Sequence, residues 1–206
     1  MNILLLGATG RVGSIILDLL LKTDHCITVL VREPNKLPFQ RSNLKIITGD
    51  VLNEKTRTNA LSGIDGVISS LNTDGNDTLS KTAERIIPLL VSNNIKRIVT
   101  IGTAGILNSR VDPAILRYKS AESKRKSQTA AQDHEKAYYL FQKSNLNWTI
   151  ICPTYLPEGE ITKQYRIEED FLPLNGQSIS TGDTAHFTVN EFFNCKHIGK
   201  RVGISY

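Results

Sequence analysis

The sequence predicts an α/β fold in which an open, doubly wound parallel sheet has helices on both faces. Short apolar runs, rich in β-branched residues, alternate along the chain with segments of helical periodicity. This alternation is typical of parallel strands joined by right-handed crossover helices. The runs are almost continuously apolar, as strands buried on both faces are. A length of 206 residues suits one domain with a sizeable core.

Each expected element follows from its local pattern. The segment 11–22 shows the helical period most clearly, with apolar residues three and four positions apart. After residue 152 the alternation ends, and a stretch rich in proline and glycine is expected to cross the carboxyl edge of the sheet. The expected strands are 3–6, 26–31, 44–48, 66–71, 96–102, 147–152 and 200–206. The expected helices are 11–22, 53–61, 78–93, 129–144 and 181–193, the last with Thr181 or Asp183 as its N-cap.

Composition excludes several classes of protein. No apolar run reaches the ~20 residues of a membrane span, and no basic region precedes the first one as in a signal peptide, so a cytoplasmic protein is expected. The net charge of +5 comes mostly from scattered residues. The one dense basic cluster, 118–127, is expected to be a solvated surface, so no nucleic-acid partner is predicted.

The three cysteines predict neither disulfides nor a metal site. Cys26, Cys152 and Cys195 are widely spaced, and none belongs to a CxxC pair. Cys26 and Cys152 lie in apolar runs and are expected to be small core residues. The acidic residues between 158 and 170 do not form a metal-ligand pattern either.

A glycine pattern follows the first expected strand. The sequence GATGRVG places Gly7, Gly10 and Gly13 between that strand and an amphipathic helix. Gly7 suits a tight turn, Gly10 lets the backbone approach a pyrophosphate, and Gly13 lets the helix pack closely on the strand. The start of the helix then offers unpaired N–H groups and a partial positive charge to phosphates. The pattern therefore predicts dinucleotide binding in a Rossmann-like fold.

Two cations after the second expected strand indicate whether the dinucleotide is NAD or NADP. An acidic residue at this place typically binds the ribose 2′-OH of NAD, whereas cations suit the 2′-phosphate of NADP. Here the positions carry Arg32 and Lys36, and a guanidinium can bind a phosphate through two hydrogen bonds. NADP(H) is therefore the expected cofactor. The alternatives are that Glu33 turns inward to serve a 2′-OH, or that both cations are solvated surface charges.

Further cofactor contacts are expected at the ends of the third and fourth strands, because ligands of this fold lie at the carboxyl ends. Asp50 and Val51 are candidates for contacts with adenine, although Asp50 could instead cap the helix that begins near Asn53. The groove residues expected after the fourth strand are Leu71, Asn72 and Thr73.

Seven stretches of the chain carry a family resemblance, and in order they are GATGRVG, VREPNKLP, GDVLN, GIDGVISSLNT, KRIVTIGTAG, DHEKAYYLFQKSNLNWTIICP and ISTGDTAHF. Together they resemble the atypical short-chain dehydrogenases/reductases with an NAD(P)H-binding (NmrA-like) domain, and within them the biliverdin-IXβ/flavin reductase-like group. The resemblance covers most of the chain and implies one domain, 1–206, with a dinucleotide-binding core (1–152) and a substrate-side part (153–206).

The resemblance also implies site residues. It places a phosphate turn, two 2′-phosphate cations, two adenine contacts, a hydroxyl beside the nicotinamide and a segment flanking the nicotinamide amide. The implied phosphate turn comprises Gly7, Thr9, Gly10, Arg11, Val12 and Gly13, and the implied 2′-phosphate cations are Arg32 and Lys36. By the same resemblance, Asp50 and Val51 contact adenine, Thr103 carries the hydroxyl beside the nicotinamide, and Pro153, Thr154 and Tyr155 flank the nicotinamide amide. Some reductases of this type carry a histidine where this chain has Tyr155.

The usual tyrosine–lysine pair of short-chain dehydrogenases is not expected to act here. Tyr139 and Lys143 have the right spacing, but the active tyrosine of the family lies farther before the proline that ends the sixth strand. The proton is therefore expected from water or from the hydroxyl of Thr103 or Tyr155. His134 is a further candidate, with a purely structural hydrogen bond as the alternative.

Three functions fit these observations in decreasing order. The first is an NADPH-dependent reductase that transfers a hydride to a flavin, a quinone or a similar small planar acceptor. The second is a non-catalytic NAD(P)-binding redox sensor that acts through a protein partner. The third is a sugar-nucleotide epimerase, which fits poorly with the short C-terminal part. Residues 104–127 and 156–172 are expected to shape the acceptor pocket. The sequence makes no prediction of the oligomeric state.

Overall fold

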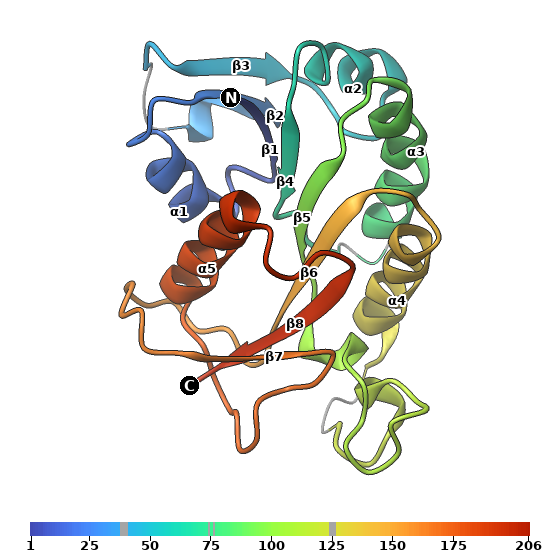
Figure 1. The fold of residues 1–206 in the computed structure, drawn as a ribbon. Helices are drawn as coiled ribbons and strands as arrows, with labels where there is room; N and C mark the ends of the chain where they lie inside the picture. The colour runs from blue at the N-terminus through green and yellow to red at the C-terminus, as the bar shows by residue number, and fades with distance from the viewer. Residues whose placement is uncertain (38–40, 74, 76, 124–126) are drawn as a thin grey trace.

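A sheet of eight strands organises the computed structural model, which describes residues 1–37, 41–73, 75, 77–123 and 127–206 (Figure 1). The strand order is β3-β2-β1-β4-β5-β6-β8-β7, in which only the β7–β8 pair is antiparallel. The prediction of a doubly wound parallel sheet is therefore confirmed. The strands are β1 (Asn2–Leu6), β2 (Cys26–Val31), β3 (Leu44–Thr48), β4 (Gly66–Ser69), β5 (Arg97–Ile101), β6 (Asn147–Pro153), β7 (Arg166–Glu169) and β8 (Lys200–Ser205).

Helices cover both faces of the sheet (Figure 1). One face packs against α1 and α5, and the other against α2, α3 and α4. Successive side chains of a strand point to opposite faces of the sheet, so each strand contributes to both hydrophobic cores. Ile3 and Leu5 pack in the core under α1 and α5, whereas Leu4 and Leu6 pack in the core under α2, α3 and α4. The helices are α1 (Arg11–Leu20), α2 (Glu54–Ala60), α3 (Thr78–Ser92), α4 (Thr129–Gln142) and α5 (Thr181–Asn194), with short 3₁₀ turns η1 (Pro34–Lys36), η2 (Ala104–Ile106) and η3 (Arg117–Lys119).

Three details differ from the predictions. Cys26 is exposed rather than buried, because it is the first residue of β2 and lies at the amino edge of the sheet; Cys152 is buried as expected. The N-cap of α5 is Ser180, whose hydroxyl accepts from the backbone N–H of Asp183 at 2.9 Å. The strand β4 ends at Ser69, two residues earlier than predicted. All three cysteines are free.

The strand β7 was missed entirely. The segment that was expected only to cross the edge of the sheet instead adds an antiparallel strand to β8. Its sequence, RIEE, contains one apolar residue, because the strand pairs on one side only and most of it is exposed. Such a strand has almost no hydrophobic signal.

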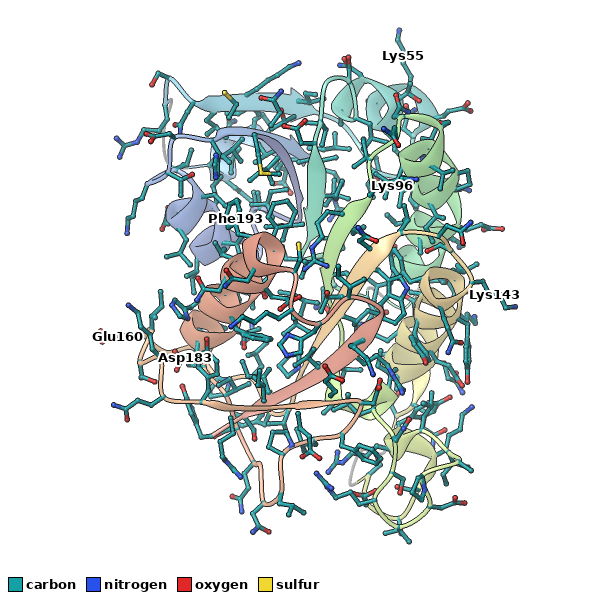
Figure 2. All side chains as sticks on the ribbon, viewed as in Figure 1. Lys55, Lys96, Lys143, Glu160, Asp183 and Phe193 are labelled. Carbon is teal, nitrogen blue, oxygen red and sulfur yellow. The ribbon has the colours of Figure 1, made fainter. Side chains whose placement is uncertain are left out.

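A buried carboxylate closes the C-terminal part of the fold. Asp183, near the start of α5, accepts hydrogen bonds from the backbone of Thr162 (2.9 Å) and Lys163 (2.7 Å) and from the hydroxyl of Tyr206 (2.8 Å). Figure 2 shows Asp183 at the start of α5, with Glu160 of the loop after β6 nearby. One side chain thus connects the helix, the loop after β6 and the last residue of the chain.

A second buried carboxylate joins α3 to α4. Asp133 of α4 is 1% exposed and accepts from the backbone N–H groups of Leu79 (3.1 Å) and Ser80 (3.0 Å) and from the Ser80 hydroxyl (2.6 Å). It therefore pairs N–H groups in the first turn of α3 that the helix itself leaves unpaired. Burial by itself raises the pKa of Asp133, but the hydrogen bonds from Ser80 and Leu79 outweigh it and lower the pKa.

Replacing Asp133 by Asn should lower the free energy of unfolding at pH 7 by about 2–3 kcal/mol, because an amide is a weaker acceptor and presents its own N–H groups to these donors. Since the folded pKa is depressed, the contribution of Asp133 is complete above the unfolded pKa of about 3.9 and is lost as the pH falls through the folded pKa. The gap between wild type and D133N in urea unfolding should therefore narrow at pH 3.

Asp77→Asn is the matched control. Asp77 precedes the same helix, but its carboxylate forms a solvent-exposed ion pair with Lys136 at 3.0 Å. Exposed pairs contribute little to stability. Equal losses in D77N and D133N would contradict the role assigned to Asp133.

Candidate functional site

The turn between β1 and α1 has the geometry of a phosphate-binding turn. Gly7 has φ = +78°, a conformation that glycine adopts without strain, and its carbonyl accepts from the N–H of Gly10 at 3.0 Å. Gly10 is the N-cap of α1 and has no side chain to cap the helix. The first N–H groups of this ten-residue helix thus point out of the turn without a capping side chain, as in anion-binding helices.

Close packing explains the third glycine. A Cβ at position 13 would lie 2.0 Å from the carbonyl oxygen of Gly7 and 2.5 Å from Oγ of Ser70. Ser70 follows β4, and its hydroxyl is directed at the carbonyls of Leu6 and Gly7 (3.0 and 3.1 Å). Only glycine at position 13 therefore lets α1 sit on the ends of β1 and β4. These two neighbouring strands are where the chain changes direction across the sheet, the usual ligand position in open α/β sheets.

A groove of about 410 Å³ runs from this turn along the carboxyl edge of the sheet. Most of the residues predicted to contact the cofactor line it together. The backbone of the turn forms one end, and the loops after β2, β3 and β4 form its sides. The predicted residues that line it are Gly7, Thr9, Gly10, Arg32, Asp50, Val51, Leu71, Asn72 and Thr73.

Arg32 and Lys36 are placed differently. Arg32 lines the groove, whereas Lys36 is not among the groove residues. The ammonium of Lys36 pairs instead with Glu33 at 2.9 Å on an exposed surface. The Glu33 carboxylate thus pairs with Lys36, and neither residue is among those that line the groove. Of the two predicted cations, only Arg32 lines it.

The remaining residues of the predicted turn have supporting positions. Arg11 begins α1, and one of its terminal nitrogens donates to the carbonyl of Leu156 at 3.1 Å, which ties the loop after β6 to the turn. Val12 is buried in the core beneath α1. Asp50 accepts from the N–H of Leu52 at 2.7 Å, and the N-cap of α2 is Asn53 rather than Asp50.

A second pocket, of about 490 Å³, lies at the ends of β5 and β6. Thr103, Pro153, Thr154 and Tyr155, the residues expected beside the nicotinamide, line it together. Tyr155 is 68% exposed at its edge, and Thr154 donates to the carbonyl of Gln177 at 3.3 Å. Since β4 and β5 are neighbours, this pocket and the groove follow one another along the same edge of the sheet.

His134 lies apart from this pocket. It lines a small cavity of about 30 Å³ under α3 and α4, together with Thr82, Gly102 and mainly aliphatic side chains. The structure therefore brings Thr103 and Tyr155 into one pocket but does not bring His134 to it. The position of His134 agrees better with the structural alternative than with direct proton transfer to a ligand.

The rejected tyrosine–lysine pair lies away from both pockets. Tyr139 and Lys143 border a surface hollow between α3 and α4. Figure 2 shows Lys143 on the outer side of α4. Neither residue lines the groove or the second pocket.

Several pocket residues were not singled out from the sequence. Arg117, Tyr118 and Glu122 come from the connection between β5 and α4, inside the predicted range 104–127. Gly176 and Gln177 come from the segment before α5. The other predicted range, 156–172, supplies none of the described lining residues, because this segment turns away to form β7. The middle of the basic cluster, residues 124–126, lies outside the described residues.

The described residues offer neither a metal site nor a membrane-spanning helix. Across the described ranges, no three His, Cys, Asp or Glu side chains come close enough together to hold a metal ion. Within the same ranges, no helix has the length and apolar character required to cross a membrane.

Comparison with known proteins identifies the family. A family model for NAD(P)H-binding domains matches residues 7–194. The chain belongs to this NAD(P)H-binding family. The match spans the phosphate turn, both pockets and α5, and it confirms the resemblance to atypical short-chain dehydrogenases/reductases.

Several similar proteins have nearly the same extent as this chain. YwnB, an uncharacterized protein of Bacillus subtilis, is 26% identical over 98% of this chain and 96% of its own. A candidate epimerase from Bacteroides thetaiotaomicron is 27% identical, with a TM-score of 0.87 over 100% of this chain and 96% of that one. A candidate NADH-flavin reductase from Streptococcus pneumoniae is 25% identical, with a TM-score of 0.83 over 100% and 99% of the two chains.

Replacing Gly10 by Ala should separate nucleotide binding from folding. A Cβ at Gly10 would meet only the Gly7 carbonyl, at 3.4 Å, so the free energy of unfolding should stay within about 1 kcal/mol of wild type. The added methyl group occupies the place where a pyrophosphate approaches the backbone, so NADPH affinity should fall at least roughly tenfold. NADPH fluorescence titration and urea unfolding measure the two effects. Unchanged NADPH affinity in a folded G10A protein would contradict the assignment of this turn.

Proposed function

We propose that the protein is an NADPH-dependent reductase that transfers a hydride to a small planar acceptor, with a flavin-like molecule as the best fit. The observation that carries the proposal is the succession of two pockets along one edge of the sheet. The groove ends at the phosphate turn, and the neighbouring pocket contains Thr103 and Tyr155. A dinucleotide that lies along this edge would bring its nicotinamide to the second pocket, next to the acceptor.

The residues divide the work of binding. The start of α1 and the backbone of Gly10 hold the pyrophosphate, and Arg32 holds the 2′-phosphate from the opposite side of the groove. Bound NADPH supplies the hydride. The chain itself orients the two reactants and offers hydroxyl groups, on Thr103 and Tyr155, that can donate a proton to the reduced acceptor or hold a water that does.

The composition of the second pocket favours a polar acceptor. Its described lining carries hydroxyl and amide groups, including Thr103, Thr154, Gln128 and Gln177, and contains no leucine, isoleucine, valine, phenylalanine or methionine. A heteroaromatic ring with carbonyl and N–H groups on its edge would pair with these groups. A quinone with a long apolar tail would leave them unpaired. The similarity to the candidate NADH-flavin reductase agrees with this choice.

A non-catalytic redox sensor is the second candidate. It is favoured by the position of Tyr139, which borders neither pocket, so that the described pocket residues contain no tyrosine–lysine dyad of the usual kind. A sensor and a reductase would share the groove and differ in turnover. Both would act in the cytoplasm, where NADPH is available.

Turnover decides between these two functions. The purified protein should oxidise NADPH steadily, followed at 340 nm, when FMN is added, and more slowly with a long-tailed quinone because of the polar lining. Tight NADPH binding without turnover for FMN, riboflavin or a small quinone would favour the sensor.

Arg32→Ala should weaken NADPH binding roughly 50-fold and change NADH binding less than about threefold, because only NADPH carries the phosphate that the guanidinium binds. Lys36→Ala is the matched control: its ammonium pairs with Glu33 and lies outside the groove, so a smaller loss is expected. Fluorescence titration with both nucleotides measures the effect. Equal losses of NADPH and NADH affinity in R32A would overturn the 2′-phosphate assignment.

A further inference from the structure

One side of the acceptor pocket is built from a connection without regular secondary structure. Arg117, Tyr118, Glu122 and Ser123 line the pocket and are called the acceptor wall below. They belong to the long segment between β5 and α4, whose described residues form the short turns η2 and η3 but no longer helix or strand. No strand of the sheet holds the wall, so its position depends on side-chain contacts and on a few backbone hydrogen bonds, such as that from Arg117 N–H to Leu107 at 2.7 Å.

Tyr118 is the central residue of the wall. It is 5% exposed, and its Cβ lies 3.3 Å from where a Cβ on Gly105 would be. A Cβ on Gly105 would also lie 3.5 Å from Cβ of Ala131 on α4. Gly105 and Ala131 both line the pocket, and Gly105 is two residues after Thr103 in the chain. A displacement of Tyr118 would therefore change the shape of the pocket that it lines together with Gly105 and Thr103.

Glu135 of α4 fixes this tyrosine. The Tyr118 hydroxyl donates to Oε2 of Glu135, and the ammonium of Lys119 binds Oε1 of the same carboxylate at 2.6 Å. The Glu135 side chain is 14% exposed and is itself not part of the pocket lining. Both oxygens are thus used by adjacent residues of η3, a two-point attachment of the wall to α4.

A second carboxylate, that of Glu122, holds the connection together internally. Oε2 of Glu122 accepts from the backbone N–H of Arg110 at 2.9 Å, and its Oε1 lies 3.7 Å from Nε of Arg117. Glu122 therefore holds parts of the connection to one another, whereas Glu135 attaches the connection to a helix. Elsewhere in the connection, Arg110 donates to the carbonyl of Leu172, and the N–H of Asn108 donates to that of Asp170. Glu135 is thus the contact that places Tyr118 and Lys119 against α4.

We propose that Glu135 is a positioning residue for the acceptor: by holding Tyr118 and Lys119 it sets the shape of the acceptor pocket, and so the affinity for the acceptor, without touching either ligand. The inference rests on the proposed function, whose acceptor this pocket would bind. It assigns to α4 a role in acceptor binding that is separate from cofactor binding, because none of these residues lines the groove.

Two substitutions test the attachment. Tyr118→Phe removes only the hydroxyl, and Glu135→Ala removes both contacts. Each should raise the KM for FMN roughly tenfold, the loss expected for one hydrogen bond to a charged group, with less than about a threefold change in kcat or in NADPH affinity. Glu135→Gln keeps an oxygen that can accept from Tyr118 and should restore part of the loss.

Tyr138→Phe is the matched control. Tyr138 is a buried tyrosine of α4 whose hydroxyl accepts from Gln142 at 3.0 Å, and it lines neither pocket. Removing the Tyr138 hydroxyl should leave the KM for FMN unchanged. A KM that rises equally in Y118F and Y138F would indicate a general loss of stability and would overturn the inference.

A measurement without turnover separates this inference from the proposed function. FMN binding to the NADP⁺-saturated protein, followed by quenching of flavin fluorescence, should weaken in Y118F and E135A but not in Y138F. If wild type binds FMN without oxidising NADPH and Y118F binds it more weakly, the reductase proposal fails and the role of Glu135 stands. If turnover is normal and the FMN affinities of wild type, Y118F and E135A agree, the role of Glu135 is overturned alone. If wild type does not bind FMN at all, both are overturned.

Discussion

The contact between α1 and the ends of β1 and β4 determines where the phosphate turn lies. Gly7 and Gly13 meet there at a distance that leaves no room for a side chain, since a Cβ on Gly13 would fall 2.0 Å from the Gly7 oxygen. Ser70 closes the same point from the next strand. The start of α1 therefore lies at the edge where the strand order changes direction, and Arg32, directly after β2, lines the same groove.

Helix α4 has a comparable role on the other face of the sheet. Asp133 and Glu135 are two residues apart, so their side chains leave the helix about 200° from each other. Asp133 pairs with the start of α3, whose Thr78 lines the groove, and Glu135 pairs with the acceptor wall. His134, between them, faces a small internal cavity. Two carboxylates of α4 thus connect this helix to both halves of the site, Asp133 fully buried and Glu135 partly exposed.

How much the sequence reveals depends on whether a signal is local. The buried strands and the glycine turn were predicted because periodicity and spacing lie within a few residues of each other, and the structure has them almost where expected. Lys36 shows the limit: its spacing suits a 2′-phosphate, but Glu33, three residues before it, draws its ammonium away from the groove. The pairing of Tyr118 with Glu135 and the inclusion of Gln177 join residues far apart in the chain, and no local pattern marks them. The strand β7 was missed because its stability comes from pairing with β8 rather than from its own composition.

The strand β7 also affects how the molecule meets others. It is the last strand on its side of the sheet, and its short sequence, RIEE, places three charged side chains along that border. A free strand border with unpaired N–H and C=O groups is a template on which another chain can add, and short, charged strands oppose such addition. By running antiparallel to β8, this four-residue segment covers a mostly buried strand that would otherwise end the sheet. The β7 edge of the sheet is thus protected against edge-to-edge aggregation. This edge lies at the opposite end of the sheet from β3.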